Sequence, residues 1–391
     1  MKAFKIIIFF CALCCVSACT KIDDFTKYID GKEKIYPATM DSVLVRSGKN
    51  RVQIEGNLLV NSGVSAIITY WNNRQDSLVH RVNSLSGNEK IKIVVGNLPE
   101  GPINLELRSI DDKGNLSVPQ YLNGNVYGDR YREGLLQRIV LSTTFVENRL
   151  LELTLQNVSN SMGFDAVKLQ YEDVNGDMVD TVVKTKFQDS KILLPRYQLS
   201  KNIAYQTVFR PDTLSVDTFM VNSIQLLPKG EISEWFLKNY KIPFYPSEFD
   251  GSRWGTLRDW ITNAGMKNHN GVGGYSTADG GIIDLEGGWG SPAIINGKIE
   301  QTVRLAPGKY RFYCVSAWGT YSDPPVYLVV SAPNSTIPDF NNIANAKAYA
   351  KVNSNGVYFE VTQTTTFNIG LLAPNISDNI YRLQRFILEL Q

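Results

Sequence analysis

Hydrophobic and polar residues alternate along most of the chain in short runs, which is the period of β-strands with one buried face. From about residue 43 onward, clusters of Gly, Asn and Ser separate these runs at spacings of about 8–12 residues, which indicates turns between strands. No helical periodicity of any length competes with this alternation. The pattern predicts an all-β protein, and its first strands are expected at residues 51–55, 66–71, 77–82 and 90–95.

Residues 102–119 close this first group with two strands that meet at an Asp-Asp-Lys-Gly-Asn turn, where Gly114 supplies a positive φ. This closing hairpin, together with Tyr70 and Trp71, which we expect to point inward, resembles a fibronectin type III sandwich. Immunoglobulin-like sandwiches of this kind consist of two sheets of short alternating strands. We place the first sandwich at residues 41–124.

A second group of strands follows, and its hairpin at residues 166–183 aligns with residues 66–79, with a tyrosine in the same place. We therefore expect a second fibronectin-type-III-like sandwich at residues 125–224, in tandem with the first, because two copies are too few for a solenoid. The segment 126–131, Val-Tyr-Gly-Asp-Arg-Tyr, leads into this second copy.

Pro228 and Gly230 mark a break, so residues 225–240 are expected to be a linker with a brief helical turn near its end. The third domain then covers residues 241–391. Its run IEQTVRLAPGKYRFYC, residues 299–314, predicts a strand, a turn and a strand that crosses a sandwich. This run resembles a galactose-binding-like jelly roll, a fold found in many carbohydrate-binding modules, and it implies a jelly-roll β-sandwich here.

Four of the six tryptophans lie between Trp254 and Trp318. Sugars bind with the apolar face of the ring against an aromatic side chain, while carboxylates, amides and Arg take the hydroxyl groups. Aromatic residues in Gly-rich or turn-forming stretches are therefore candidate ligand-binding residues, with an acid and a base nearby as polar partners: Trp289, Trp318, Tyr321, Tyr275, Asp250 and Arg253. The alternative is that these rings plug the ends of the sandwich, as we expect for Trp254 and Trp260.

The N-terminus carries two lysines and an apolar run at residues 6–13, followed by Val-Ser-Ala-Cys at residues 16–19. This order resembles the bacterial lipoprotein box, which implies a signal peptide at residues 1–18, acylation of Cys19 and a tether at residues 19–40. The alternative is an ordinary secretory signal that happens to end in cysteine.

Lys21, Asp23 and Asp24 resemble the export signal of Bacteroidetes surface lipoproteins, although Ile22 separates the lysine from the acidic pair. The alternative is a charged linker without a signal. The stretch from about residue 21 to 221 also resembles an N-terminal uncharacterised domain family of these lipoproteins, with segment 126–131 as the most similar piece. The resemblance implies a lipid anchor in the outer membrane that faces the medium, and it brings no catalytic residue.

Charge and residue counts exclude several kinds of chemistry. The 391 residues carry a net charge of +2, so we expect no nucleic-acid partner. Once the signal is removed and Cys19 is acylated, Cys314 is the one remaining thiol. His80 and His269 have no metal-ligand spacing and are expected to be solvated loop residues. We expect no metal and no cofactor; acidic loops offer oxygen ligands for calcium, but no spacing calls for it.

We therefore expect a non-catalytic surface lipoprotein that binds extracellular glycan, beside a polysaccharide transporter complex, with the two sandwiches as spacers. The first alternative is a protein-adhesion or structural module with the same folds. The second is a weakly active accessory of glycoside hydrolases, for which Asp250, Asp259, Asp284 and Glu286 are the available acids.

Overall fold

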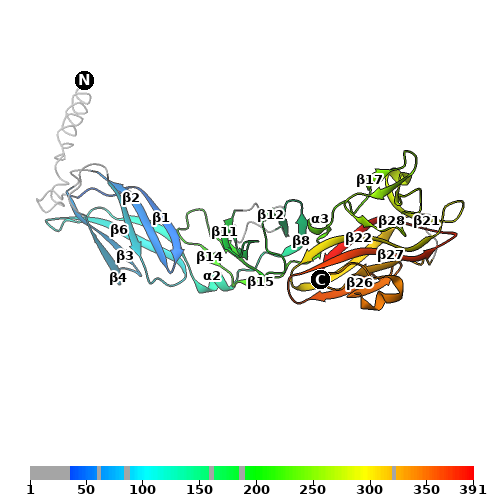
Figure 1. Ribbon diagram of the computed structural model, residues 1–391. Coiled ribbons are helices and arrows are strands. Elements are labelled where there is room, and N and C mark those ends of the chain that lie inside the picture. The colour runs from blue at the N-terminus through cyan, green and yellow to red at the C-terminus, as the bar shows by residue number, and fades with distance from the viewer. Residues whose placement is uncertain (1–35, 60–62, 83–88, 158–162, 185–189, 319–322) are drawn as a thin grey trace, which may run out of the picture. The chain divides into compact units, whose positions relative to one another are not determined.

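The structure, a computed structural model, describes residues 36–59, 63–82, 89–157, 163–184, 190–318 and 323–391 (Figure 1). Strands make up most of these residues, which confirms the all-β class. The chain divides into two compact units, residues 1–133 with 212–218, and residues 134–211 with 219–391. Within the described ranges, no helix is both long enough and apolar enough to span a membrane.

The first unit contains a sandwich of seven strands: β1 (Asp41–Lys49), β2 (Arg51–Leu58), β3 (Val64–Trp71), β4 (Asp76–Arg81), β5 (Glu89–Val95), β6 (Gly101–Asp111) and β7 (Gln120–Tyr127). Their order is β4-β3-β6-β7-β1-β2-β5. A short parallel pairing of β1 with β7 joins a group of three strands, β1-β2-β5, to a group of four, β4-β3-β6-β7. This division of seven strands is the fibronectin-type-III-like arrangement that the sequence predicts.

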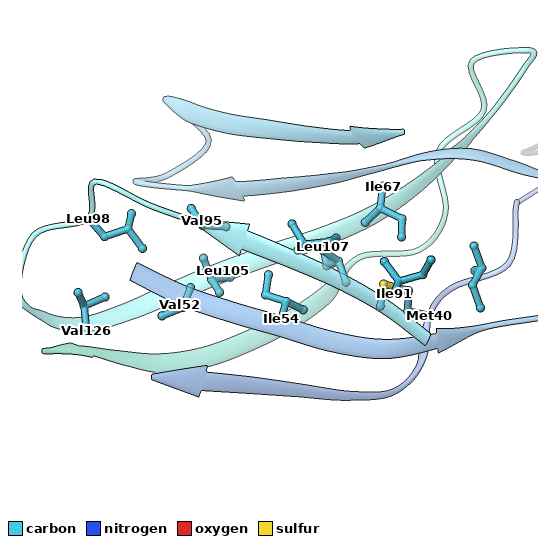
Figure 2. Packing of buried hydrophobic residues seen from close by; sticks show 12 residues of the cluster. Met40, Val52, Ile54, Ile67, Ile91, Val95, Leu98, Leu105, Leu107 and Val126 are labelled. Carbon is cyan, nitrogen blue, oxygen red and sulfur yellow. The ribbon is translucent and has the colours of Figure 1, made fainter. Parts of the chain in front are cut away.

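Alternate residues of these strands form the core of the first sandwich (Figure 2). Val52 and Ile54 of β2 lie opposite Val95 and Ile93 of β5, and all four side chains are buried. Trp71 packs against this core. The expectation that Tyr70 also points inward is wrong, because neighbouring residues of a strand face opposite sides.

Two further segments belong to the first unit. Segment 126–131, expected to lead into the second sandwich, is divided between β7 and the short helix α2 (Asp129–Glu133). Residues 212–218 are held by Arg51, whose Nη2 lies 2.6 Å from Oδ1 of Asp217. The amide of Val216 also donates a hydrogen bond of 2.8 Å to the carbonyl of Ser47.

The second unit begins with another sandwich of the same design: β8 (Val140–Val146), β9 (Leu150–Leu155), β10 (Phe164–Glu172), β11 (Met178–Val183), β12 (Ser190–Pro195), β13 (Ile203–Phe209), β14 (Phe219–Met220) and β15 (Ile224–Leu226). One sheet has the order β12-β9-β8, and the other has β11-β10-β13-β14, with β15 also on β13. The first sandwich has the same order of strands, so the two copies match in topology. The two tyrosines prove to be offset by one position, because Tyr171 stands where the first copy has Trp71. Tyr171 is therefore buried, whereas Tyr70 faces outward.

The stretch at residues 225–240 is structured rather than a free linker. It contains the end of β15, then β16 (Gly230–Glu231), which pairs with the last strand of the chain, and α3 (Ser233–Phe236), the helical turn that the sequence predicts. Trp235 of α3 donates a hydrogen bond of 2.6 Å from Nε1 to the carbonyl of Val146, and its ring packs edge-on against Phe145. This stretch is therefore packed against the second sandwich inside unit 2.

The C-terminal domain is a sandwich of two sheets: β17 (Pro246–Phe249), β18 (Trp254–Leu257), β19 (Ile261–Thr262), β20 (Gly274–Ser276), β21 (Ile282–Gly287), β22 (Ile294–Leu305), β23 (Gly308–Ser316), β24 (Tyr327–Val330), β25 (Ala348–Lys351), β26 (Val357–Val361), β27 (Thr365–Ile376) and β28 (Asn379–Leu390), with 3₁₀ turns at η3 (Ala278–Gly280) and η4 (Phe340–Asn345). The larger sheet has the order β17-β18-β20-β21-β28-β23-β26, with β16 on β28, and the smaller has β19-β22-β27-β24-β25. Because β22 and β23 lie in different sheets, the run 299–314 crosses the sandwich as expected.

An irregular pairing at Val315 and Ser316 changes which side of β28 faces the core. Before it, Tyr381 and Leu383 are buried, and after it Phe386 and Leu388 are buried. Arg382, between the first two, is therefore left on the outer face of the larger sheet.

Candidate functional site

The outer face of the larger C-terminal sheet carries a cluster of four charged side chains: Arg253, Asp284, Glu286 and Arg382. Asp284 and Glu286 lie on β21, where they alternate with core residues, and Arg382 lies directly opposite Asp284 on β28. Arg253 reaches this face from the turn before β18 and donates from Nη2 to Oδ2 of Asp284 at 3.2 Å and to Oε2 of Glu286 at 2.6 Å. We call these four residues the Arg253 cluster.

Asp284 is the buried centre of the Arg253 cluster, with 1% of its surface exposed. Its Oδ2 also accepts a hydrogen bond of 3.0 Å from Nε of Arg382, so two guanidinium groups share one carboxylate oxygen. Burial raises the pKa of Asp284, and the two guanidinium groups oppose that shift. Its other oxygen, Oδ1, is buried and has no hydrogen-bond partner among the described residues. The cluster is thus charge-balanced, with two fixed cations in front of a buried acid.

Aromatic rings extend the cluster on the side of Arg253. The Arg253 guanidinium carbon lies 4.0 Å from the centre of the Trp254 ring, and Trp254 stacks on His269 with ring centres 3.7 Å apart. His269 is only 8% exposed, so the expectation of a solvated loop histidine is wrong. Burial lowers the pKa of His269, which favours the neutral ring in this stack. Trp254 and Trp260 are both buried, as expected.

Trp318 extends the cluster on the side of Arg382. It is 69% exposed, and the Arg382 guanidinium carbon lies 5.5 Å from the centre of its ring. The amide of Ala317, the preceding residue, donates a hydrogen bond of 2.8 Å to the carbonyl of Arg382. One exposed indole is therefore held beside an arginine whose orientation is set by the buried Asp284.

Trp289 lies in the tight turn that follows β21. Gly288 and Ser291 exchange backbone hydrogen bonds of 3.0 and 2.9 Å, so Trp289 and Gly290 form a two-residue loop, and both have positive φ. The φ of 51° at Trp289 is unusual for a bulky side chain, and the residue is 60% exposed. The turn therefore displays a second indole at the end of the strand that carries Asp284 and Glu286.

The other predicted residues have different positions. Asp250 has a structural role: its Oδ1 accepts hydrogen bonds of 2.8–3.0 Å from the amides of residues 252–254, which shapes the turn that carries Arg253. Tyr275 is buried, and a side chain at the facing Gly255 would collide with its ring, so Tyr275 is a core residue. Tyr321 lies outside the described residues, as do Cys19, Lys21, Asp23 and Asp24.

Sequence reasoning missed Arg382 and His269 and named Asp284 and Glu286 only as available acids. The signal for β21 was present, because Asp284 and Glu286 alternate with Ile283 and Leu285 in a strand otherwise apolar. A carboxylate that is buried at such a position calls for a cationic partner, because an unpaired buried charge is costly.

The described residues contain no group of three or more His, Cys, Asp and Glu side chains that could hold a metal ion. Cys314, on β23, lies 3.2 Å from the hydroxyl of Tyr381, and burial raises the pKa of its thiol to about 11. Such a thiol stays protonated at neutral pH, which is the opposite of what a nucleophile or a metal ligand needs.

Two protein-family models match most of the chain. A family model described as a domain of unknown function, DUF4998, matches residues 19–219. The chain belongs to the DUF4998 family. A second model, DUF5013, also described as a domain of unknown function, matches residues 238–374 of this DUF4998 protein, and these include the Arg253 cluster apart from Arg382.

Two solved structures similar to this DUF4998 protein are pairs or arrays of fibronectin domains from chicken. The FN1–FN3 domains of chicken CNTN1 are 11% identical, with a TM-score of 0.30, over 50% of this chain and 69% of theirs. A two-domain fibronectin type III segment of chicken tenascin is 8% identical, with a TM-score of 0.19, over 48% of this chain and 98% of its own. No curated protein matches the sequence.

Proposed function

We propose that this DUF4998 protein is a non-catalytic surface protein that binds extracellular glycan through the outer face of its C-terminal sandwich. The observation that carries the proposal is the exposed ring of Trp318 beside Arg382, which is fixed by the buried Asp284. An exposed aromatic face next to oriented hydrogen-bond donors suits the apolar face and the hydroxyl groups of a sugar ring. Trp289 adds a second exposed indole.

Two features support a binding site over a hydrolase site. The acid and the base of a glycosidase stand on the two sides of the scissile bond, about 5–9.5 Å apart. Here Asp284 and Glu286 both accept hydrogen bonds from the same nitrogen, Nη2 of Arg253, which ties them together on one side. Oδ1 of Asp250 accepts hydrogen bonds from three backbone amides, which gives this acid a role in the turn before β18.

We infer that the C-terminal sandwich is a galactose-binding-like jelly roll. Its two antiparallel sheets and the crossing of run 299–314 from β22 to β23 support this assignment. We also propose that acylated Cys19 anchors the chain in the outer membrane, that Lys21, Asp23 and Asp24 direct it to the outer leaflet, and that a polysaccharide transporter complex is its neighbour. The lipoprotein-like order of residues 16–19 supports the anchor.

A glycan array with the wild-type chain and two single variants, Trp318→Ala and Trp289→Ala, tests the proposed function. We expect wild-type binding to one class of polysaccharide and a loss of that signal in Trp318→Ala. Tyr349→Ala is the matched control, because it removes an exposed tyrosine from β25 of the other sheet. An array without any signal, or release of reducing ends from the bound polysaccharide, would contradict the proposal.

A further inference from the structure

The first sandwich has a hollow of about 540 Å³ at one end of its four-stranded group. Strand β3 ends at Trp71, and its last pairing with β6 joins Tyr70 to Glu106. Strand β6 continues beyond this pair to Gly101, so the turn after β3 and the free part of β6 enclose the space. A volume of this size is within the range of small-ligand sites, about 300–1,000 Å³.

A buried carboxylate forms the floor of this hollow. Glu106 is 8% exposed and is held by two arginines. Arg74 donates from Nε to Oε2 at 2.7 Å and from Nη2 to Oε1 at 2.6 Å, and Arg108 donates from Nε to Oε1 at 2.6 Å. Such forked pairing fixes the arginine in one orientation, so its remaining face is presented to the hollow in a defined direction.

The turn that carries Arg74 has an uncommon backbone. Asn72, Asn73 and Arg74 have φ of 49°, 52° and 63°, and this left-handed path returns the Arg74 side chain over the sheet to Glu106. Positive φ is tolerated by Asn but disfavoured for Arg. Three such residues in succession, at the rim of a hollow, indicate a strained turn whose role is to position the Arg74 side chain.

Tyrosine rings stand on both sides of Glu106. Tyr70 on β3 and Tyr121 on β7 are the direct neighbours of Glu106 across β6, so all three side chains lie on one face in one row. Tyr121 is 73% exposed, and the Arg74 guanidinium carbon lies 5.9 Å from the centre of the Tyr70 ring. Two ring faces therefore border a charge-paired floor.

We propose that this hollow of the first sandwich is a second binding site, and that it takes a short segment of a neutral glycan. Its lining pairs Arg74 with Glu106 and adds the side-chain amides of Asn72, Asn73 and Asn104, which both donate and accept hydrogen bonds. Asp76 is a second acid of the lining, and Arg108, which also donates to Glu106, balances it. A charge-balanced site with amides and aromatic rings matches the hydroxyl groups and the apolar face of a sugar. The class of ligand rests on the proposed function, whereas the site rests on this geometry.

An added peptide strand is the other occupant that an open sheet edge admits. Pro102 lies on the free part of β6 and Pro99 lies beside it, both in the lining. Proline cannot donate a backbone hydrogen bond to an added strand, and proteins place it at edges to prevent such pairing. The observations therefore favour a glycan over a peptide.

Calorimetric titration of the full chain tests this site, with neutral hexasaccharides of glucose, xylose, mannose and galactose as probes. The variants are Tyr121→Ala for the hollow, Trp289→Ala with Trp318→Ala for the C-terminal face, and all three together. Tyr36→Ala is the control, since it removes an exposed tyrosine of the first unit outside the lining. Thermal unfolding by circular dichroism checks that each variant folds.

We expect two hexasaccharides per wild-type chain, one per chain in Tyr121→Ala and in the double tryptophan variant, and none in the triple variant. If Tyr121→Ala still binds a second hexasaccharide, we expect the affinity of that site to be about tenfold lower, which is the contribution of one aromatic contact. A different result would overturn this inference and keep the proposed function: the wild-type chain binds one hexasaccharide, Tyr121→Ala binds it equally well, and the double tryptophan variant does not bind it. Loss in Tyr121→Ala alone would keep the inference and overturn the C-terminal site, and no binding by any probe would overturn both.

Discussion

Trp289 is held at a φ of 51° with its indole exposed. The left-handed region costs an L-residue roughly 1–2 kcal/mol, and an indole that is 60% exposed recovers only part of that cost through burial. The two-residue turn needs positive φ, but Gly or Asn would adopt it at lower cost, and strain of this kind is typical of residues kept for binding. At the scale of one residue, the backbone of this turn therefore supports a ligand-facing role for Trp289.

A pair of substitutions tests the strain. Trp289→Gly and Trp289→Ala both remove the indole, but only Gly accepts positive φ without steric cost. We expect Trp289→Gly to be more stable than Trp289→Ala by about 1 kcal/mol in urea-induced unfolding of unit 2. Equal stability of the two variants would show that the turn is not strained at this position.

The sequence was sufficient to predict the exposed tryptophans but not the charged residues that lie beside them. Trp289 and Trp318 could be predicted because Gly and Pro around them exclude a strand interior. Arg382 could not, because its contact with Asp284 joins residues 98 positions apart and depends on the strand order. Tyr275, in a similar Gly-rich stretch, proved to be buried, since Gly255 opposite leaves room for its ring.

At the scale of the element, the stability of the four-stranded group of the first sandwich depends on the charge of Glu106. Hydrogen bonds from Arg74, followed by those from Arg108, lower the pKa of Glu106, and burial opposes them. A lowered pKa in the folded state contributes stability above the pKa of the unfolded chain, about 4.3, and that contribution is lost as the pH falls through the folded value.

Substitution Glu106→Gln should therefore destabilise the first unit at pH 7 and have a smaller effect near pH 3. Urea-induced unfolding of wild type and variant at both pH values measures the difference. Glu89→Gln, at an exposed position of β5, is the control and should change stability little at either pH. A loss of stability in Glu106→Gln that is equal at pH 7 and pH 3 would contradict the charge pairing.

The alternation of apolar residues was sufficient to predict β2, β3, β5 and β10, because each of these strands has one face in a core and polar turns on either side. It misplaced β7, since the sequence predicts the last strand of the first sandwich before residue 119 and the strand begins at Gln120. It was insufficient for residues 225–240. The strands there are two or three residues long, and β16 pairs with Glu389 and Leu390 at the far end of the sequence. Local patterns carry no information about such pairings.

At the scale of the whole molecule, the proposal joins a lipid anchor at one end of the sequence to a glycan-binding sandwich at the other. Protease treatment of intact cells tests the anchor. We expect the wild-type chain to be digested and Lys21→Ala with Asp23→Ala and Asp24→Ala to be protected, because the variant would stay inside the outer membrane. Equal digestion of both would show that these three residues are not the export signal.

The central claim is that the exposed tryptophans of the C-terminal sandwich contact the glycan, and ¹⁹F NMR of the 5-fluorotryptophan-labelled chain tests it most directly. The six tryptophans give separate signals, assigned by single Trp→Phe variants. On addition of the glycan selected by the array, we predict shifts for Trp318 and Trp289 and none for the buried Trp235 and Trp260. Saturated binding with the Trp318 and Trp289 signals unchanged would contradict the account.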